Sequence, residues 1–287
     1  MRAPPPTIDP DCYRASDPAL ASLDDATAVA HYRAYGRARG VVASPLALRE
    51  NLLDFIDDEY SLLEIGPFWQ PLKRGPNVEY LDVLDADQLR ARAAQTRGNP
   101  AGVPDHIHHV GSLEAVDRRY DAVLSSHSIE HHPDLVRHLQ LVERVLNPGG
   151  AYFLIIPDKR YCFDHFITES TIADVIAAYR ESRTVHTLKS VIEHRALTTH
   201  NDSLRHWRGD HGNAERHRAS RTRAAIEEFD RAEGAYIDVH AWYFTPPAFR
   251  SIMSILREMG LIRLDIAGVY HPAFGRNEFC AILNLPG

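Results

Sequence analysis

Short apolar runs alternate along this chain with stretches whose apolar residues recur at helical spacing. Five such runs, each bounded by turn residues, occur at 61–65, 78–82, 106–110, 120–126 and 151–156. Short apolar runs of this kind are typical of buried strands in a parallel sheet. Strands that alternate with helices predict βαβ units, and therefore a doubly wound α/β domain.

The helical stretches have recognisable starts and ends. The pattern predicts helices over 44–56, 86–96, 133–146 and 246–256. In the last of these, Thr245 is a suitable capping residue and Pro246 and Pro247 suit a first helical turn. Two further runs, 261–267 and 278–283, predict a hairpin-like pair of strands that completes the sheet.

The regular alternation stops between residues 158 and 240. This segment is helical in character and rich in His, Arg and Asp, and it is too long for a connecting loop. We therefore expect an N-terminal arm (1–43), a core (44–157 and 241–287) and a helical insertion (158–240) that acts as a lid. The prolines near the start of the arm exclude a long helix there and predict a chain that runs over the surface.

Composition narrows the functional class. The chain has 287 residues, 44% of them hydrophobic, and a net charge of −7, which disfavours nucleic acid as the main partner. It has no apolar stretch long enough for a membrane span, and its first residues lack the apolar core of a signal peptide. We therefore expect a cytoplasmic protein without membrane partners. Cys12, Cys162 and Cys280 form no CxxC pair and are expected to be reduced thiols.

Four signatures occur in order along the strands: Glu64-Ile65-Gly66, Asp82, 121–126 with Glu130-His131, and 146–150 (Leu-Asn-Pro-Gly-Gly). Together they make 62–157 and 242–287 resemble the class I S-adenosylmethionine-dependent methyltransferases, in particular the branch with small-molecule acceptors. The resemblance implies seven strands in the order 3-2-1-4-5-7-6, with the last one antiparallel. It also implies S-adenosyl-L-methionine as the cofactor.

The resemblance further implies which residues hold the cofactor. Backbone near Gly66 is expected at the methionine part, and Asp82 at the ribose. The full set of cofactor candidates is Glu64, Gly66, Pro67, Asp82, Ser112, Leu113, Ser126 and His127. This family's loop usually has two or three glycines, but here Phe68 and Trp69 stand where glycine is common. The pair either packs on the adenosine or fills a gap behind the loop.

The candidates for catalysis follow the fourth strand. A histidine at the end of a central strand can take a proton from an acceptor hydroxyl near neutral pH, so His127, Glu130 and His131 are the catalytic candidates. Packing beside the next helix is an alternative role for the histidines. The letters HxxEH also occur in zinc peptidases, but there they lie on a helix, whereas here they follow a strand. A divalent ion held by Glu130, His131 and histidines of the insertion is possible but not favoured, and no metal is assigned.

Donor-rich segments of the insertion are expected to bind the acceptor. These candidates are Lys159, Arg160, Tyr161, His200, Arg205, His206 and His240. The sequence thus predicts methyl transfer to a hydroxyl of a small polar acceptor, such as a sugar, a glycan end or a secondary metabolite. The alternatives are other chemistry on the same cofactor, namely aminocarboxypropyl transfer or cyclisation, and a non-catalytic regulatory protein.

Overall fold

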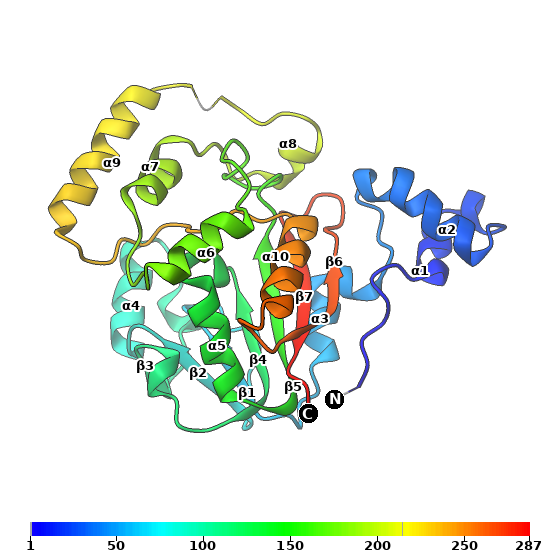
Figure 1. The fold of residues 1–287 in the computed structure, drawn as a ribbon, viewed down its shortest axis with the longest axis horizontal. Coiled ribbons are helices and arrows are strands. Elements are labelled where there is room, and N and C mark those ends of the chain that lie inside the picture. The colour runs from blue at the N-terminus through cyan, green and yellow to red at the C-terminus, as the bar shows by residue number, and fades with distance from the viewer. Residues whose placement is uncertain (1, 214) are drawn as a thin grey trace.

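A seven-stranded sheet forms the centre of the computed structural model, which describes residues 2–213 and 215–287 (Figure 1). Its strand order is β3-β2-β1-β4-β5-β7-β6, and β7 is antiparallel to both of its neighbours. The order and the antiparallel strand predicted from the sequence are therefore confirmed. The strands are β1 (Leu62–Ile65), β2 (Val78–Asp82), β3 (His109–Val110), β4 (Tyr120–Ser126), β5 (Leu146–Pro157), β6 (Asp265–Tyr270) and β7 (Glu278–Asn284).

Helices cover both faces of this sheet. The α-helices are α1 (Pro10–Ala15), α2 (Asp25–His31), α3 (Arg49–Phe55), α4 (Ala86–Gln95), α5 (Leu135–Val145), α6 (Ile172–Arg180), α7 (Leu188–Ala196), α8 (Ser203–Trp207), α9 (Arg218–Ala232) and α10 (Pro246–Glu258). One apolar cluster joins α5, α6 and α10 to one face of the sheet, and another joins α3 to the opposite face. This is the layering expected of a doubly wound domain.

The central strands show why these residues form a buried sheet. Val123 of β4 and Tyr152 of β5 pack in the cluster under α5 and α10, whereas Leu124 and Phe153 pack in the cluster under α3. Successive side chains of a strand point to opposite faces, so a strand covered on both sides must be apolar throughout. All four of these side chains are fully buried. The continuous apolar runs in the sequence reflect this double burial.

Several element boundaries differ from the prediction. β3 contains only His109–Val110. β5 starts at Leu146, so the Asn-Pro-Gly-Gly segment between the predicted helix (133–146) and the predicted strand (151–156) belongs to the strand. β6 starts at Asp265 rather than at 261. The predicted helix over 44–56 is interrupted, because Leu48 has extended backbone angles between a 3-10 turn, Pro45–Ala47, and α3.

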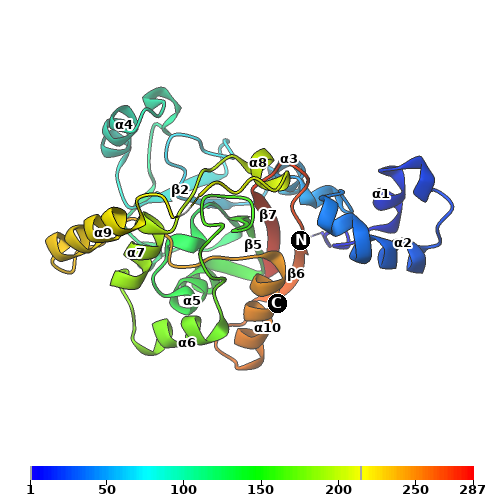
Figure 2. The ribbon, with the colours of Figure 1, turned by 90° about the horizontal axis from the view of Figure 1, so that it is seen from above.

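The N-terminal arm is more ordered than the sequence suggested. No long helix forms at its start, as predicted, but its prolines open short elements: Pro10 starts α1, where Asp9 accepts a hydrogen bond from Cys12 N. Tyr13, Ala28 and Tyr32 form a small apolar cluster of their own. Figure 2 shows α1 and α2 standing out to one side of the sheet. The arm therefore has its own apolar cluster and does not simply run over the surface.

Of the helices in the insertion, α7, α8 and α9 lie above the carboxyl ends of the parallel strands (Figure 1), whereas α6 packs beside α5 on one face of the sheet. α7 and α9 pack together through Val191 and Ala225, and Val239 joins them where the chain returns to the core. The insertion thus faces the edge of the sheet where parallel α/β domains bind ligands. None of the helices in the described ranges has both the length and the apolar character that crossing a membrane would require.

Candidate functional site

A cavity of about 600 Å³ lies at the carboxyl ends of β1, β2 and β4. Ile65 and Leu81 at the strand ends and Leu89 and Arg92 of α4 line it, and Tyr236 of the insertion lines it too. This volume falls in the usual range for small-molecule and cofactor sites, about 300–1,000 Å³. Six of the residues that the sequence predicted for this site line the cavity: Gly66, Asp82, Ser112, Leu113, His127 and His131.

The turn after β1 depends on one glycine and one buried acid. Gly66 has a φ of 70°, which favours glycine, and a Cβ added at this position would lie 3.8 Å from Ser128 Oγ, its nearest neighbour. Behind this turn, the carboxylate of Glu64 accepts hydrogen bonds from Leu72 N (2.8 Å) and Lys73 N (3.1 Å). Burial raises the pKa of Glu64 to about 7. Glu64 and Pro67 are not among the residues that line the cavity, and Glu64 instead shapes the loop from behind.

Phe68 and Trp69 lie in different environments. Phe68 has a φ of 42°, the left-handed region that glycine adopts most easily, and its side chain is part of the cavity wall. Trp69 packs against the loop after α4, where a Cβ on Gly98 would come within 2.8 Å of Trp69 Nε1. One aromatic ring therefore lines the cavity, the other fills space outside it, and the pair leaves the cavity open.

Asp82 occupies the position expected of an acid at the end of β2. Its side chain is 9% exposed, and Leu84 N lies 3.4 Å from Oδ1. Burial raises the pKa of this carboxyl, while hydrogen bonds from backbone N–H groups, including that of Phe68, act in the opposite direction. Because Asp82 faces the cavity, a ligand that donates hydroxyl hydrogen bonds would compensate for its burial.

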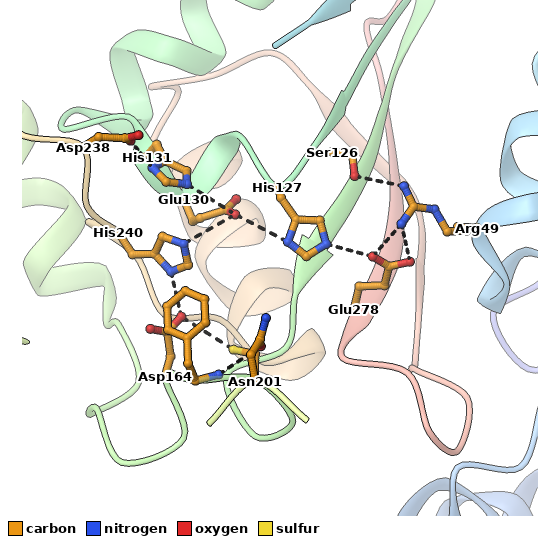
Figure 3. A network of polar contacts seen from close by, with 12 residues as sticks. Arg49, Ser126, His127, Glu130, His131, Asp164, Asn201, Asp238, His240 and Glu278 are labelled. Carbon is orange, nitrogen blue, oxygen red and sulfur yellow. Dashed lines mark hydrogen bonds and ion pairs between the residues drawn. The ribbon is translucent and has the colours of Figure 1, made fainter. Parts of the chain in front are cut away.

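His127 lies where β4 leaves the sheet, and its φ of 48° is again left-handed. Its Nε2 lies 2.8 Å from Glu278 Oε2, and Arg49 donates to the same carboxylate at 3.1 Å (Figure 3). Burial alone would lower the pKa of His127, but Glu278 and the charge of Glu130 raise it. Ser126 accepts a hydrogen bond from Arg49 at 3.4 Å and does not line the cavity.

Glu130 is the centre of a group of histidines beside this cavity. Its side chain is fully buried, and neither carboxylate oxygen has a hydrogen-bond partner among the described residues. One oxygen, Oε1, lies 3.9 Å from His127 Nδ1, 3.9 Å from His131 Nε2 and 3.9 Å from His240 Nε2. His240 is the one predicted acceptor residue that reaches this group (Figure 3).

The predicted acceptor residues that directly follow β5 are engaged elsewhere. Lys159 Nζ donates to His165 O at 2.9 Å, and Arg160 forms a paired contact with the buried carboxylate of Asp158, at 2.9 and 2.6 Å. Tyr161 stacks on Trp207, with ring centroids 3.8 Å apart. None of these three side chains lines the cavity.

His200, Arg205 and His206 belong to a second group of side chains that mostly contact each other. Arg205 pairs with Asp210 at 2.8 Å, and His206 Nδ1 lies 3.0 Å from His211 Nδ1. Burial lowers the pKa of His206 to about 4. We predicted an acceptor site here because the segment is rich in hydrogen-bond donors. In the structure, these side chains do not line the cavity. Their acceptor role remains a prediction.

Several residues of the site had no signal in the sequence. Arg49 and Glu278 come from α3 and β7, far from the strand-end motifs, and reach His127 only in the folded sheet. Tyr236 of the insertion, which the sequence analysis did not single out, lines the cavity together with Asp238. The carboxylate that contacts His127 is distant from it in the chain, so no local pattern could have indicated it.

Residues 66–154 match a family model described as a methyltransferase domain. This segment contains the glycine turn, Asp82 and the β4 motif, and it lies in a sheet with the order 3-2-1-4-5-7-6. This segment is therefore similar to methyltransferase domains, and the sheet that holds it has the strand order that the resemblance to class I S-adenosylmethionine-dependent methyltransferases implies. The family model spans less than half of the chain, so the insertion and the arm lie outside it.

Solved structures similar to this methyltransferase-domain protein share little sequence with it. The glycopeptide N-methyltransferase MtfA complexed with sinefungin is 24% identical over 40% of this chain and 54% of its own, with a TM-score of 0.30. A methyltransferase from Pyrococcus furiosus is 11% identical over 90% of this chain and 94% of its own, with a TM-score of 0.37. This chain thus spans about half the length of MtfA, and scores this low carry no argument about function. No curated protein matches the chain.

We predict that Glu64→Ala destabilises the methyltransferase domain, because the N–H groups of Leu72 and Lys73 lose their acceptor. The expected loss is about 1–3 kcal/mol in the free energy of unfolding, measured by urea denaturation. Glu64→Gln is the matched control, since it keeps one acceptor oxygen and should lose less. Equal stability of the wild type and Glu64→Ala would contradict this role.

Proposed function

We propose that this chain transfers the methyl group of S-adenosyl-L-methionine to a hydroxyl of a small polar acceptor, such as a sugar, a glycan end or a secondary metabolite. The observation that carries the proposal is one cavity lined together by Gly66, Asp82 and His127. The first two are the expected cofactor contacts, and the third is a base candidate. In this proposal the insertion, 158–240, serves as a lid on the acceptor side.

The residues at the cavity fit the cofactor. A buried acid at the end of β2 suits two ribose hydroxyls, and the glycine turn allows close approach of backbone to the methionine part. Ser112 and Leu113 lie beside Asp82 on the cavity wall and would flank the adenine. When bound, the cofactor supplies an electrophilic methyl group on its sulfonium. The protein's task is then to hold the acceptor oxygen in line with that methyl group.

His127 is the side chain best placed to take the acceptor's proton. It lines the cavity at the end of β4, and Glu278 holds its ring through Nε2 at 2.8 Å. A carboxylate behind a histidine base orients the ring and stabilises the charge that forms on it, as in other acid–base pairs. A neutral hydroxyl needs such a base, which is why we favour a hydroxyl acceptor over an amine.

Transfer of the cofactor's aminocarboxypropyl group would use the same cavity as methyl transfer. The identity of the spent cofactor distinguishes these two reactions. Methyl transfer leaves S-adenosylhomocysteine, whereas transfer of the aminocarboxypropyl group leaves methylthioadenosine. Mass spectrometry of the nucleoside product therefore separates these reactions. A persistently bound cofactor with no product from any candidate acceptor would favour a regulatory protein. The cytoplasmic location and the absence of a nucleic-acid partner stay predictions from composition.

We predict that Asp82→Ala weakens binding of S-adenosylhomocysteine by about 10- to 100-fold, the usual worth of hydrogen bonds to a charged group. Isothermal titration of the wild type and the variant measures this. Asp87→Ala is the control, because Asp87 is an exposed carboxylate of α4 that pairs with Arg90 outside the cavity. No binding by the wild type, or equal binding by all three proteins, would overturn the proposed cofactor site.

We predict that His127→Asn lowers kcat by about 10²- to 10⁴-fold, the usual contribution of a general base, and changes the affinity for S-adenosylhomocysteine little. The measurement is turnover of labelled cofactor with an acceptor found by screening hydroxyl compounds. His106→Asn is the matched control, since His106 is exposed and does not line the cavity. An unchanged kcat in His127→Asn would remove His127 from the reaction.

A further inference from the structure

We propose that Glu130, His131 and His240 bind a divalent first-row transition-metal ion beside the cofactor cavity. One donor atom from each of these side chains lies within 4.8 Å of the other two. Glu130 and His131 follow β4, while His240 is at the end of the insertion. The three donors therefore meet only in the folded protein (Figure 3).

The distances suit a site that closes slightly around an ion. Metal–nitrogen and metal–oxygen bonds are about 2.0–2.2 Å long, so two donors on one ion lie about 3.4 Å apart in a tetrahedral site and at most about 4.3 Å apart. His131 Nε2 and His240 Nε2 are each 3.9 Å from Glu130 Oε1. A movement of about half an ångström would bring these side chains to ligand geometry.

Each histidine has a carboxylate behind it. His240 Nδ1 is hydrogen-bonded to Asp164 Oδ2 at 2.7 Å. His131 Nδ1 lies 2.9 Å from Asp238 Oδ1, a close ion-pair contact without hydrogen-bond geometry. In both rings this contact leaves Nε2 facing Glu130. Histidines that bind metals almost always have such a carboxylate or carbonyl on the other ring nitrogen, which sets the tautomer and the ring orientation. The arrangement has the outer contacts of a metal site as well as its ligands.

The carboxylate of Glu130 is a second and independent observation. It is fully buried, and both of its oxygens lack a hydrogen-bond partner in the described ranges. Burying a carboxylate without a partner costs about several kcal/mol of folding free energy unless another group compensates its charge. An ion held between this oxygen and the two imidazoles would compensate it.

Another histidine group is less suited to metal binding. His165, His206 and His211 also lie close together, but His206 and His211 contact each other through their Nδ1 atoms at 3.0 Å. The rings of His165 and His211 are stacked, with centroids 3.7 Å apart. His206 Nε2 is used by the carbonyl of His200. These nitrogens satisfy backbone groups and one another, whereas those around Glu130 converge on an unpaired carboxylate.

The donor set indicates which ions fit. Two imidazoles and one carboxylate suit Zn²⁺, Fe²⁺ or Co²⁺, whereas Mg²⁺ and Ca²⁺ prefer oxygen ligands. Three protein ligands leave at least one position open. His131 also lines the cofactor cavity, so that position would be available to an acceptor oxygen. This last step rests on the proposed function: a bound ion would lower the pKa of the acceptor hydroxyl, with His127 on the other side of Glu130 as the base.

The test uses the full chain after treatment with a chelator. Titration with Zn²⁺ by calorimetry, and with Co²⁺ by its visible absorption, should give one ion per chain. Glu130→Gln should abolish this binding, and Asp164→Asn, which acts through His240, should weaken it by about 10- to 100-fold. His211→Asn is the matched control and should bind as the wild type does. Thermal unfolding of each variant shows that it is folded.

Each outcome bears on one proposal. The metal site is overturned if the wild type binds no stoichiometric ion. It is also overturned if His211→Asn loses the ion while Glu130→Gln binds it fully. Should Glu130→Gln fail to fold, the Co²⁺ spectrum of the wild type and of His131→Asn decides, because His131 belongs to this group, whereas His240 and Asp164 also lie together with His194. An unchanged spectrum in His131→Asn would overturn the site. Titration of S-adenosylhomocysteine in the presence of chelator tests the cofactor site separately. Cofactor binding without metal binding would overturn the metal site and leave the proposed function intact.

Discussion

Parallel pairing of β1 with its two neighbours is the constraint on which the site depends. Ile65 of β1 is paired with Leu81 of β2 on one side and with Ser125 of β4 on the other. The three strands therefore end at the same height, and the residues that follow them meet at one edge of the sheet. Gly66, Asp82 and His127 line one cavity for this reason, although long stretches of chain separate them.

The end of the insertion is tied to the same place by backbone hydrogen bonds. Ala241 N and Trp242 N both donate to Glu130 O, at 2.7 and 3.2 Å. This double contact places His240 beside the side chain of Glu130, so a residue of the insertion becomes part of the site after β4. The end of the insertion and the core are thus joined directly at Glu130.

Carboxylates alternate with arginine and histidine side chains at this edge of the sheet. Arg49 pairs with Glu278, Glu278 with His127, and His127 faces Glu130, while Asp238 and Asp164 stand behind the two remaining histidines (Figure 3). Such a row lets histidines be held in defined orientations within a buried setting, where unpaired charges are costly. Glu130, the carboxylate of this row whose two buried oxygens have no hydrogen-bond partner among the described residues, lies in the middle of the row.

The sequence alone determined the class of fold, and the resemblance of its motifs to a known family implied the strand order and the expected position of the cofactor residues. Apolar periodicity and turn residues are local properties, and the glycine turn and Asp82 sit directly at strand ends, so both could be located without coordinates. Only the tertiary structure decided which polar residues meet. Glu278 reaches His127 from β7, Asp164 reaches His240 across the insertion, and the donor-rich segment around His206 contacts itself instead of the cavity. These contacts join residues that are distant in the chain, and a local sequence pattern cannot indicate which distant residues will meet.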